Sequence, residues 1–116
     1  MIAVIFEVFP APERADEYLQ TAAMLKPELE KIDGFISIER FSSLNEDGKV
    51  LSLSFWRDEE SIRQWRNLES HRIAQAKGRD GVFKNYRLRV AEVCRDYELN
   101  DRQEAPLDSQ SQFKNK

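Results

Sequence analysis

An apolar run near the start of the chain restricts the possible folds more than any other segment. Residues 2–9 are β-prone and apolar on both alternating faces, and Glu7 is their only charged member. A strand with one face in water alternates apolar and polar side chains, so this run predicts a strand covered on both faces. Pro10 ends it after too few residues to cross a membrane, and the run lacks the basic leader and cleavage site of a signal peptide.

A helix is predicted next. Pro12 suits a first helical turn, and Glu13 there favours the helix dipole. Pro27 lies inside the helical pattern and predicts a kink, because proline lacks the amide donor. Gly34 supplies the residue that ends the helix. Apolar residues three and four apart define its buried side: Ala15, Tyr18, Leu19, Ala22, Leu25, Leu29 and Ile32.

Two alternating segments, residues 35–42 and 50–56, predict a β-hairpin. The polar connection 43–49 contains the turn formers Asn45 and Gly48. Strand periodicity places Ile36 and Ile38 on one face of the first strand, and Phe35, Ser37 and Phe41 on the other.

A second helix and a last strand complete the pattern. Asp58 is a suitable N-cap for the helix, and Ile62 and Trp65 mark its buried side. Ser70 is expected to cap a separate second helical stretch. Residues 86–97 then alternate as a strand, in which we expect Cys94 to face the core.

The order β-α-β-β-α-β predicts an α+β, ferredoxin-like domain over residues 1–98. Such a domain has a four-stranded antiparallel sheet with both helices on one face. The other face would be open in a monomer, yet the first strand is apolar on that side too. We therefore expect a homodimer in which a partner sheet covers it. Residues 99–116 are polar and are expected to form a mobile tail.

Composition excludes several classes of function. The chain has 21 acidic and 18 basic residues, a formal net charge of −3, and no concentrated excess of Lys and Arg for binding nucleic acid or a membrane surface. Cys94 is the only cysteine, which excludes an intrachain disulfide and favours the cytoplasm. With His71 as the only histidine, a Cys/His zinc site within one chain is excluded as well.

The stretch FWRDEE at 55–60, followed by Trp65, His71 and Tyr86, resembles the antibiotic biosynthesis monooxygenase family. The first strand and the helix exit IDGF at 32–35 fit the same pattern, so the resemblance covers about residues 1–98. It implies a dimeric α/β barrel with a ligand cavity between sheet and helices in each subunit. Family members include monooxygenases without a cofactor that act on aromatic or quinol-like compounds, and haem-degrading enzymes.

The haem-degrading branch of this family has an Asn on the first strand, a Trp on the second helix and a His about ten residues later. Trp65 matches the Trp, but Gln75 stands at the histidine position and Glu7 is the polar residue of the first strand. This chain therefore lacks the expected axial iron ligand, and haem degradation is disfavoured.

Five residues are candidates for chemistry or ligand contact. His71 suits proton transfer because its ordinary pKa is near neutrality; a surface or helix-capping role is the alternative. Trp65 and Trp56 are expected to line the cavity, with pure core packing as the alternative. Tyr86 and Arg40 are expected to orient a substrate, although plain packing of the tyrosine and pairing of the arginine with nearby acids compete.

Glu7 and Gln75 are further candidates for substrate contact. An inward-facing Glu7 carboxylate with a raised pKa would mark a site, whereas an inter-subunit salt bridge is the competing account. The family resemblance, together with the absence of a cofactor motif in the sequence, thus implies a monooxygenase without a cofactor or metal that acts on a small phenolic or quinol-like metabolite. A non-catalytic dimer that binds a small aromatic or hydrophobic molecule is the alternative, and a haem-binding protein is the third.

Overall fold

The computed structural model describes the backbone of residues 1–75 and 83–114, and the side chains of residues 1–68 and 83–110. The order of strands and helices confirms the βαββαβ prediction. The elements are β1 (Ile2–Pro10), a 3-10 turn η1 (Pro12–Arg14), α1 (Ala15–Glu30), β2 (Phe35–Ser42), β3 (Val50–Trp56), α2 (Glu59–Gln75), β4 (Phe83–Glu92) and α3 (Leu107–Lys114).

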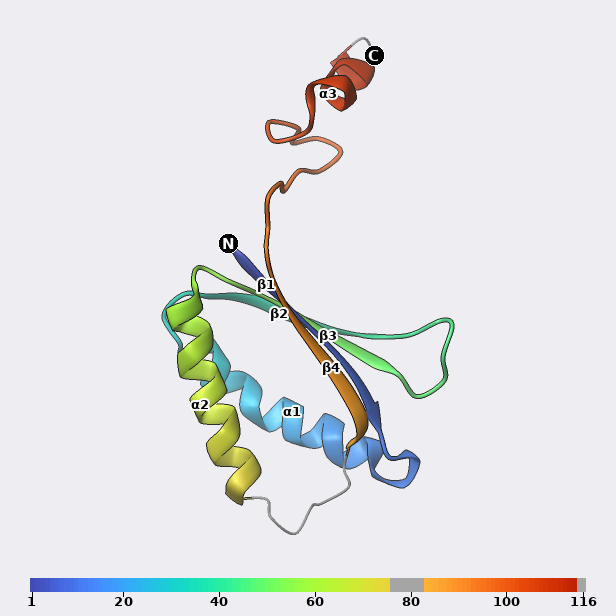
Figure 1. Cartoon of the computed structure of the whole chain (residues 1–116), viewed down its shortest axis with the longest axis vertical. Helices are drawn as coiled ribbons and strands as arrows, with labels where there is room; N and C mark the ends of the chain where they lie inside the picture. Colours follow the sequence, from blue (N-terminus) through green and yellow to red (C-terminus); the bar gives the residue numbers. More distant parts are fainter. Residues whose placement is uncertain (76–82, 115–116) are drawn as a thin grey trace.

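The four strands form one antiparallel sheet in the order β2-β3-β1-β4. Helices α1 and α2 lie on the same face of this sheet (Figure 1). Val4 in β1 is opposite Ser54 in β3 and Val90 in β4, so these three residues share the helix-facing side. This is the predicted ferredoxin-like arrangement. We call the opposite side of the sheet the open face, because no helix of the described chain covers it.

The core lies between the sheet and the two helices. Trp56 is fully buried, and Val4, Leu29 and Ile62 pack with it. Burying an aliphatic side chain such as Leu29 contributes about 1.5–3 kcal/mol to stability, so this cluster holds α1 and α2 against the sheet. Partly buried residues complete it: Ile2, Ile32, Phe35, Ile38 and Trp65.

A tight junction at Gly34 fixes the start of α2. Gly34 has a φ of +96°, a left-handed conformation that favours glycine, and its carbonyl accepts the Arg57 N–H at 2.7 Å. Asp58 caps α2 as predicted, because its Oδ1 accepts the Ser61 N–H at 2.9 Å. The Ser61 hydroxyl lies 2.8 Å from the carbonyl oxygen of Asp33 and 2.7 Å from Asp58 Oδ1, so its one proton has two acceptors and the helix start lies against the chain before β2.

Two local predictions in the middle of the chain are wrong. The register of β2 against β3 shifts between Phe35 and Ser37, so Phe35 and Ile38 both pack on the core while Ile36 is 52% exposed. One extra residue in a strand moves its neighbours to the other face. The helix break expected near Ser70 is absent, because α2 continues to Gln75.

The end of the chain also differs from expectation. β4 ends at Glu92, and Cys94 is exposed, so a core-facing Cys94 is wrong. Val93 still donates its N–H to the Met1 carbonyl at 3.0 Å. Within the described chain, the residues after Val93 pair with no strand. The segment predicted as a tail contains α3, which stands well away from the sheet (Figure 1). Its mobility remains a prediction.

Candidate functional site

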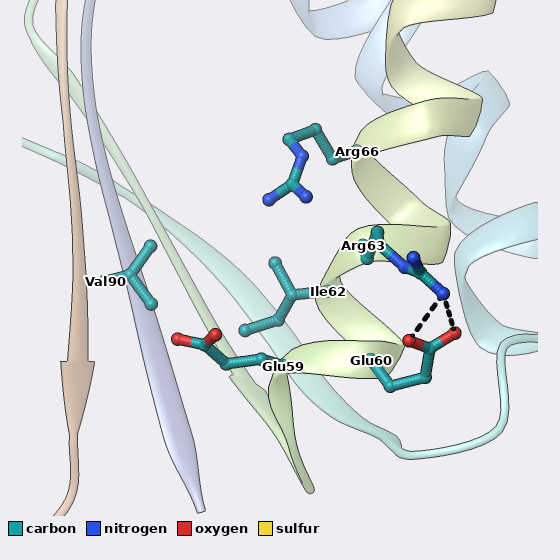
Figure 2. Close-up of a pocket in the computed structure, with 6 residues that line it drawn as sticks. All are labelled: Glu59, Glu60, Ile62, Arg63, Arg66 and Val90. Atoms are coloured by element: carbon teal, nitrogen blue, oxygen red, sulfur yellow. Dashed lines mark hydrogen bonds and ion pairs between the residues drawn. The ribbon is translucent and has the colours of Figure 1, made fainter.

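A groove separates α2 from β4 on the helix-facing side of the sheet. It has a volume of about 300 Å³. Figure 2 shows Ile62 of α2 pointing across it toward Val90 of β4. We call this hollow the α2–β4 groove, and its lining residues are Glu59, Glu60, Ile62, Arg63, Arg66 and Val90.

The β4 side of the groove is apolar and accessible. Tyr86, Leu88 and Val90 alternate along β4 on the helix-facing side, opposite Val8, Phe6 and Val4. Their exposed fractions are 58%, 52% and 48%, large values for apolar residues beneath a helical layer. An uncovered apolar stripe bordered by charged residues is typical of a ligand-binding surface.

Aromatic rings continue this stripe at the start of β4. The ring of Tyr86 lies 5.6 Å from that of Phe6 and 6.2 Å from that of Phe83. Tyr18 of α1 packs edge-on against Phe83 at 5.5 Å. These contacts fix one side of the Tyr86 ring and leave the other exposed, an arrangement that suits stacking with a flat apolar ligand.

Charged residues line the α2 side of the groove. Glu60 and Arg63 form an ion pair at 2.8 Å. Arg66 has no carboxylate partner among the side chains that the structure describes, and its guanidinium points toward the strands (Figure 2). Glu59, two helical turns earlier, points toward Val90. The groove therefore has an acidic end and a basic end, with apolar surface between them.

The two tryptophans lie on the helix side of the sheet. Trp56 is completely buried, and its Nε1–H donates to Ser54 Oγ at 2.9 Å. Trp65 is partly buried and packs against the same core cluster. Both are core residues; their predicted role in lining a ligand cavity remains a prediction.

Arg40 lies on the helix-facing side of β2, opposite Ser52. Its Nε is buried without a hydrogen-bond partner in the described chain. A buried N–H without a hydrogen-bond acceptor costs stability. An acceptor atom of a substrate could receive this hydrogen bond, and the contact between Arg40 and substrate stays a prediction.

Glu7 lies on the opposite, open face of the sheet. Its carboxylate contacts Lys49 Nζ at 2.8 Å and also pairs with Arg89. Hydrogen bonds from Lys49 and then Arg89 hold the pKa of the Glu7 carboxyl below its ordinary value. Of the two accounts of Glu7, the inward-facing carboxylate with a raised pKa is thereby excluded, because two cations of the same chain stabilise the ionised form. A salt bridge from Glu7 to a second subunit stays a prediction.

A second hollow of about 360 Å³ surrounds these charges on the open face. Its apolar lining includes Ile5, Leu51 and Phe41, the last of which is 42% exposed. The described chain thus carries apolar surface on both sides of the sheet, as the pattern of β1 predicted.

The remaining predicted residues, His71 and Gln75, belong to α2. Their side chains fall outside the described part of the chain, so their direction remains a prediction. Arg66 was missed at the sequence level, as was the position of the β4 stripe opposite α2. The spacing of Glu59, Ile62 and Arg66 along one helix face was the available signal, but only the folded chain places β4 opposite that face.

Two absences concern the described residues alone. They include no group of three or more His, Cys, Asp or Glu side chains placed to hold a metal ion. None of the helices within them is long and apolar enough to cross a membrane.

The sequence matches the model of the antibiotic biosynthesis monooxygenase family over residues 1–77. It is 52% identical over 101 residues to a protein of Pyricularia oryzae named jasmonate monooxygenase ABM. That match covers 87% of this chain and 47% of the relative, so the chain spans about half the relative's length.

Solved structures with the same fold are more distant in sequence. A Deinococcus radiodurans protein described as a putative antibiotic biosynthesis monooxygenase superposes with a TM-score of 0.71 at 13% identity, covering 85% of this chain and 98% of that one. The haem degrader MhuD of Mycobacterium tuberculosis, solved with two haems in its active site, gives 0.63 at 18% identity, covering 84% and 100%. At these identities the likeness concerns the fold.

Proposed function

Because this chain belongs to the antibiotic biosynthesis monooxygenase family, we propose that it is a monooxygenase that oxidises a small hydrophobic metabolite without a bound cofactor. The family match over residues 1–77 and the 52% identity to a named monooxygenase carry this proposal. The α2–β4 groove is the proposed substrate site, since it joins an accessible apolar stripe to a few convergent polar groups.

A phenolic or quinol-like substrate supplies the electrons in this proposal. Removing a proton from an activated methylene next to phenolic rings gives an anion that reacts with O₂. The balanced reaction is R₂CH₂ + O₂ → R₂C=O + H₂O, in which the carbon loses four electrons and O₂ gains four. One oxygen atom enters the product and the other leaves as water, so no outside reductant is needed.

The protein's part is to remove the proton, stabilise the anion and exclude water. His71 is the proposed proton acceptor because its ordinary pKa is near 6.5. Tyr86 on β4 and Arg40 are the proposed orienting groups, and Trp65 and Trp56 the proposed walls. Arg40 lies on β2, the opposite edge strand of the sheet, so in this proposal it contacts only a substrate that extends from the groove across the helix-facing side. Gln75 is a proposed polar contact on the same helix. Glu7, whose charge is neutralised on the open face, is the weakest member of the predicted set.

The relative from Pyricularia oryzae supports a second candidate, hydroxylation of a jasmonate-like acid. Jasmonate is a small apolar cyclopentanone with a carboxylate. Hydroxylating a C–H bond with O₂ consumes two further electrons, because R–H + O₂ + 2e⁻ + 2H⁺ gives R–OH + H₂O. This candidate therefore requires an external two-electron donor, whereas the first does not.

Oxygen uptake separates these candidates. We expect the purified chain to consume O₂ with an anthrone-type or quinol substrate in the absence of a reductant, and His71→Ala to slow this about tenfold or more. Uptake with jasmonic acid only when NADPH or ascorbate is present would favour the second candidate. If no substrate in either series is consumed, while mass spectrometry finds a retained small molecule, the chain is a binding protein and the proposal fails.

We also propose that the chain acts as a homodimer in the cytoplasm. The apolar open face favours a partner sheet, which would remove its exposed surface from water. The single, exposed Cys94 suits a reducing compartment, where it remains a free thiol.

A further inference from the structure

Arg66 at the α2–β4 groove differs from the other arginines near the start of α2. Arg57 pairs with Asp58 at 3.0 Å and with Asp33 at 3.2 Å, and Arg63 pairs with Glu60 at 2.8 Å. Arg66 lies one helical turn beyond Arg63, and no carboxylate among the described side chains neutralises it. Its side chain extends over the groove instead of along the helix surface (Figure 2).

The surface beside Arg66 suits the apolar part of a ligand. Ile62 and Val90 line the groove next to it, and Leu88 and Tyr86 continue the apolar stripe along β4. A guanidinium beside apolar surface attracts a carboxylate more strongly than one in open water, because water screens the two charges less there. Its planar fork can also make two parallel hydrogen bonds to the carboxylate.

Glu59 gives the groove a direction. It is seven residues from Arg66, which corresponds to about 10 Å along a helix, and it points toward Val90 at the other end (Figure 2). A carboxylate near Glu59 would be repelled, whereas the same group near Arg66 would be attracted. The two charges therefore favour one orientation of a small acid about as long as the groove.

We propose that the α2–β4 groove selects an apolar carboxylic acid, with Arg66 binding the carboxylate and the β4 stripe binding the apolar body. This inference rests on the proposed function, which makes the groove the substrate site, and it adds the chemical class of the substrate. Arg66 is thus a specificity residue that contacts the ligand away from the reacting carbon.

The test compares an acid with its neutral ester. Jasmonic acid and methyl jasmonate share one apolar body and differ in the negative charge. Each competes with the neutral fluorescent probe N-phenyl-1-naphthylamine bound to the full chain. We expect the acid to bind about tenfold more tightly than the ester, and this preference to decrease as salt is added. Equal displacement by acid and ester would overturn the proposal.

Variants assign the preference to one side chain. Arg66→Gln should weaken binding of the acid about tenfold and change binding of the ester by less than about twofold, while Arg66→Lys should restore part of the loss. Arg57→Gln is the control, since it removes a paired arginine just before α2 that does not line the groove, and it should leave both affinities unchanged. A similar loss for acid and ester in Arg66→Gln, or an equal loss in Arg57→Gln, contradicts the assignment.

These binding measurements separate the two proposals. An Arg66-dependent preference for the acid in a protein that consumes no oxygen supports the ligand class and refutes the monooxygenase. Oxygen uptake together with acid binding that does not depend on Arg66 supports the monooxygenase and refutes the ligand class proposed for the groove.

Discussion

Glu7 and Lys49 form an ion pair on the open face of the sheet, with 2.8 Å between Glu7 Oε1 and Lys49 Nζ. The second carboxylate oxygen of Glu7 contacts Arg89 of β4. One acid in β1 therefore pairs with two cations, Lys49 just before β3 and Arg89 in β4. Lys49 also lies 5.4 Å from the centre of the Phe9 ring. A charge cluster embedded in apolar surface is tolerated in a dimer interface when the charges are paired, and it then favours one mode of pairing.

Glu7→Gln should therefore weaken self-association. The variant leaves Lys49 and Arg89 without their shared acid, on a face that we propose to be buried in the dimer. We expect the dissociation constant of the dimer, measured by sedimentation equilibrium at pH 7, to rise roughly tenfold or more. Glu46→Gln is the control, because the Glu46 carboxylate lies 3.9 Å from the same Lys49 Nζ but is 57% exposed. Equal dissociation constants for both variants would argue against a role for this cluster.

Leu53→Arg should convert the protein into a monomer. Leu53 lies on the open face of the central strand β3, opposite Ile5. An arginine there lies opposite Glu39 of β2 and places a charge in the middle of the proposed interface, where desolvation is costly even for a paired charge. Size-exclusion chromatography with light scattering measures the change. Leu44→Arg, at a fully exposed position in the β2–β3 connection, should leave the mass unchanged. A wild-type monomer would refute the homodimer directly.

Gly34→Ala should destabilise the chain far more than Gly48→Ala. Both glycines have positive φ values, +96° and +80°, so an alanine at either costs about 1–2 kcal/mol of backbone strain. A Cβ at Gly34 would also lie 1.9 Å from Ser61 Oγ, whereas nothing lies within 4 Å of one at Gly48. Overpacking adds about 1–3 kcal/mol. Urea unfolding of the two variants gives the difference, and equal losses would show that the junction at Gly34 is not tightly packed.

Most of the fold follows from local patterns in the sequence. Residues 2–9 predicted β1 almost to its end, because a short β-prone run with apolar side chains on both faces favours a covered strand. The Asp58 cap placed the start of α2 correctly, since a side-chain acceptor before a helix is a local signal. The β2 bulge escaped prediction because the insertion of one residue is decided by pairing with β3. The end of β4 depends likewise on where β1 ceases to be its neighbour.

The site was less predictable than the fold. Tyr86 was selected through its place on β4 and lies on the helix-facing side of that strand, where its contact with substrate stays a prediction, but Arg66 of the groove lining was not selected. An exposed arginine on a charged helix resembles any solvated side chain until the strand opposite it is known. For Glu7, a lone acid in an apolar strand left a substrate contact and a salt bridge open, because its partners Lys49 and Arg89 come from distant parts of the sequence and only the folded chain shows them.

The Asp58 cap should make stability depend on pH in the acid range. Hydrogen bonds from the Ser61 backbone N–H and hydroxyl, and from Arg57, lower the pKa of Asp58 from 3.8 to about 2. A group with a lowered folded-state pKa stabilises the fold above its unfolded pKa, and this contribution is lost as pH falls through the folded pKa. The contribution of Asp58 is therefore complete above about pH 4 and disappears between pH 4 and pH 2.

Asp58→Asn tests this dependence, because asparagine still caps a helix but does not titrate. We expect the Tm of the wild type to exceed that of the variant at pH 7 by a few degrees, and the difference to close between pH 4 and pH 2. Asp47→Asn, in the exposed β2–β3 connection, should show no such closing difference. A constant gap between wild type and Asp58→Asn from pH 7 to pH 2 would mean that the ionised carboxylate adds nothing to the cap beyond its shape.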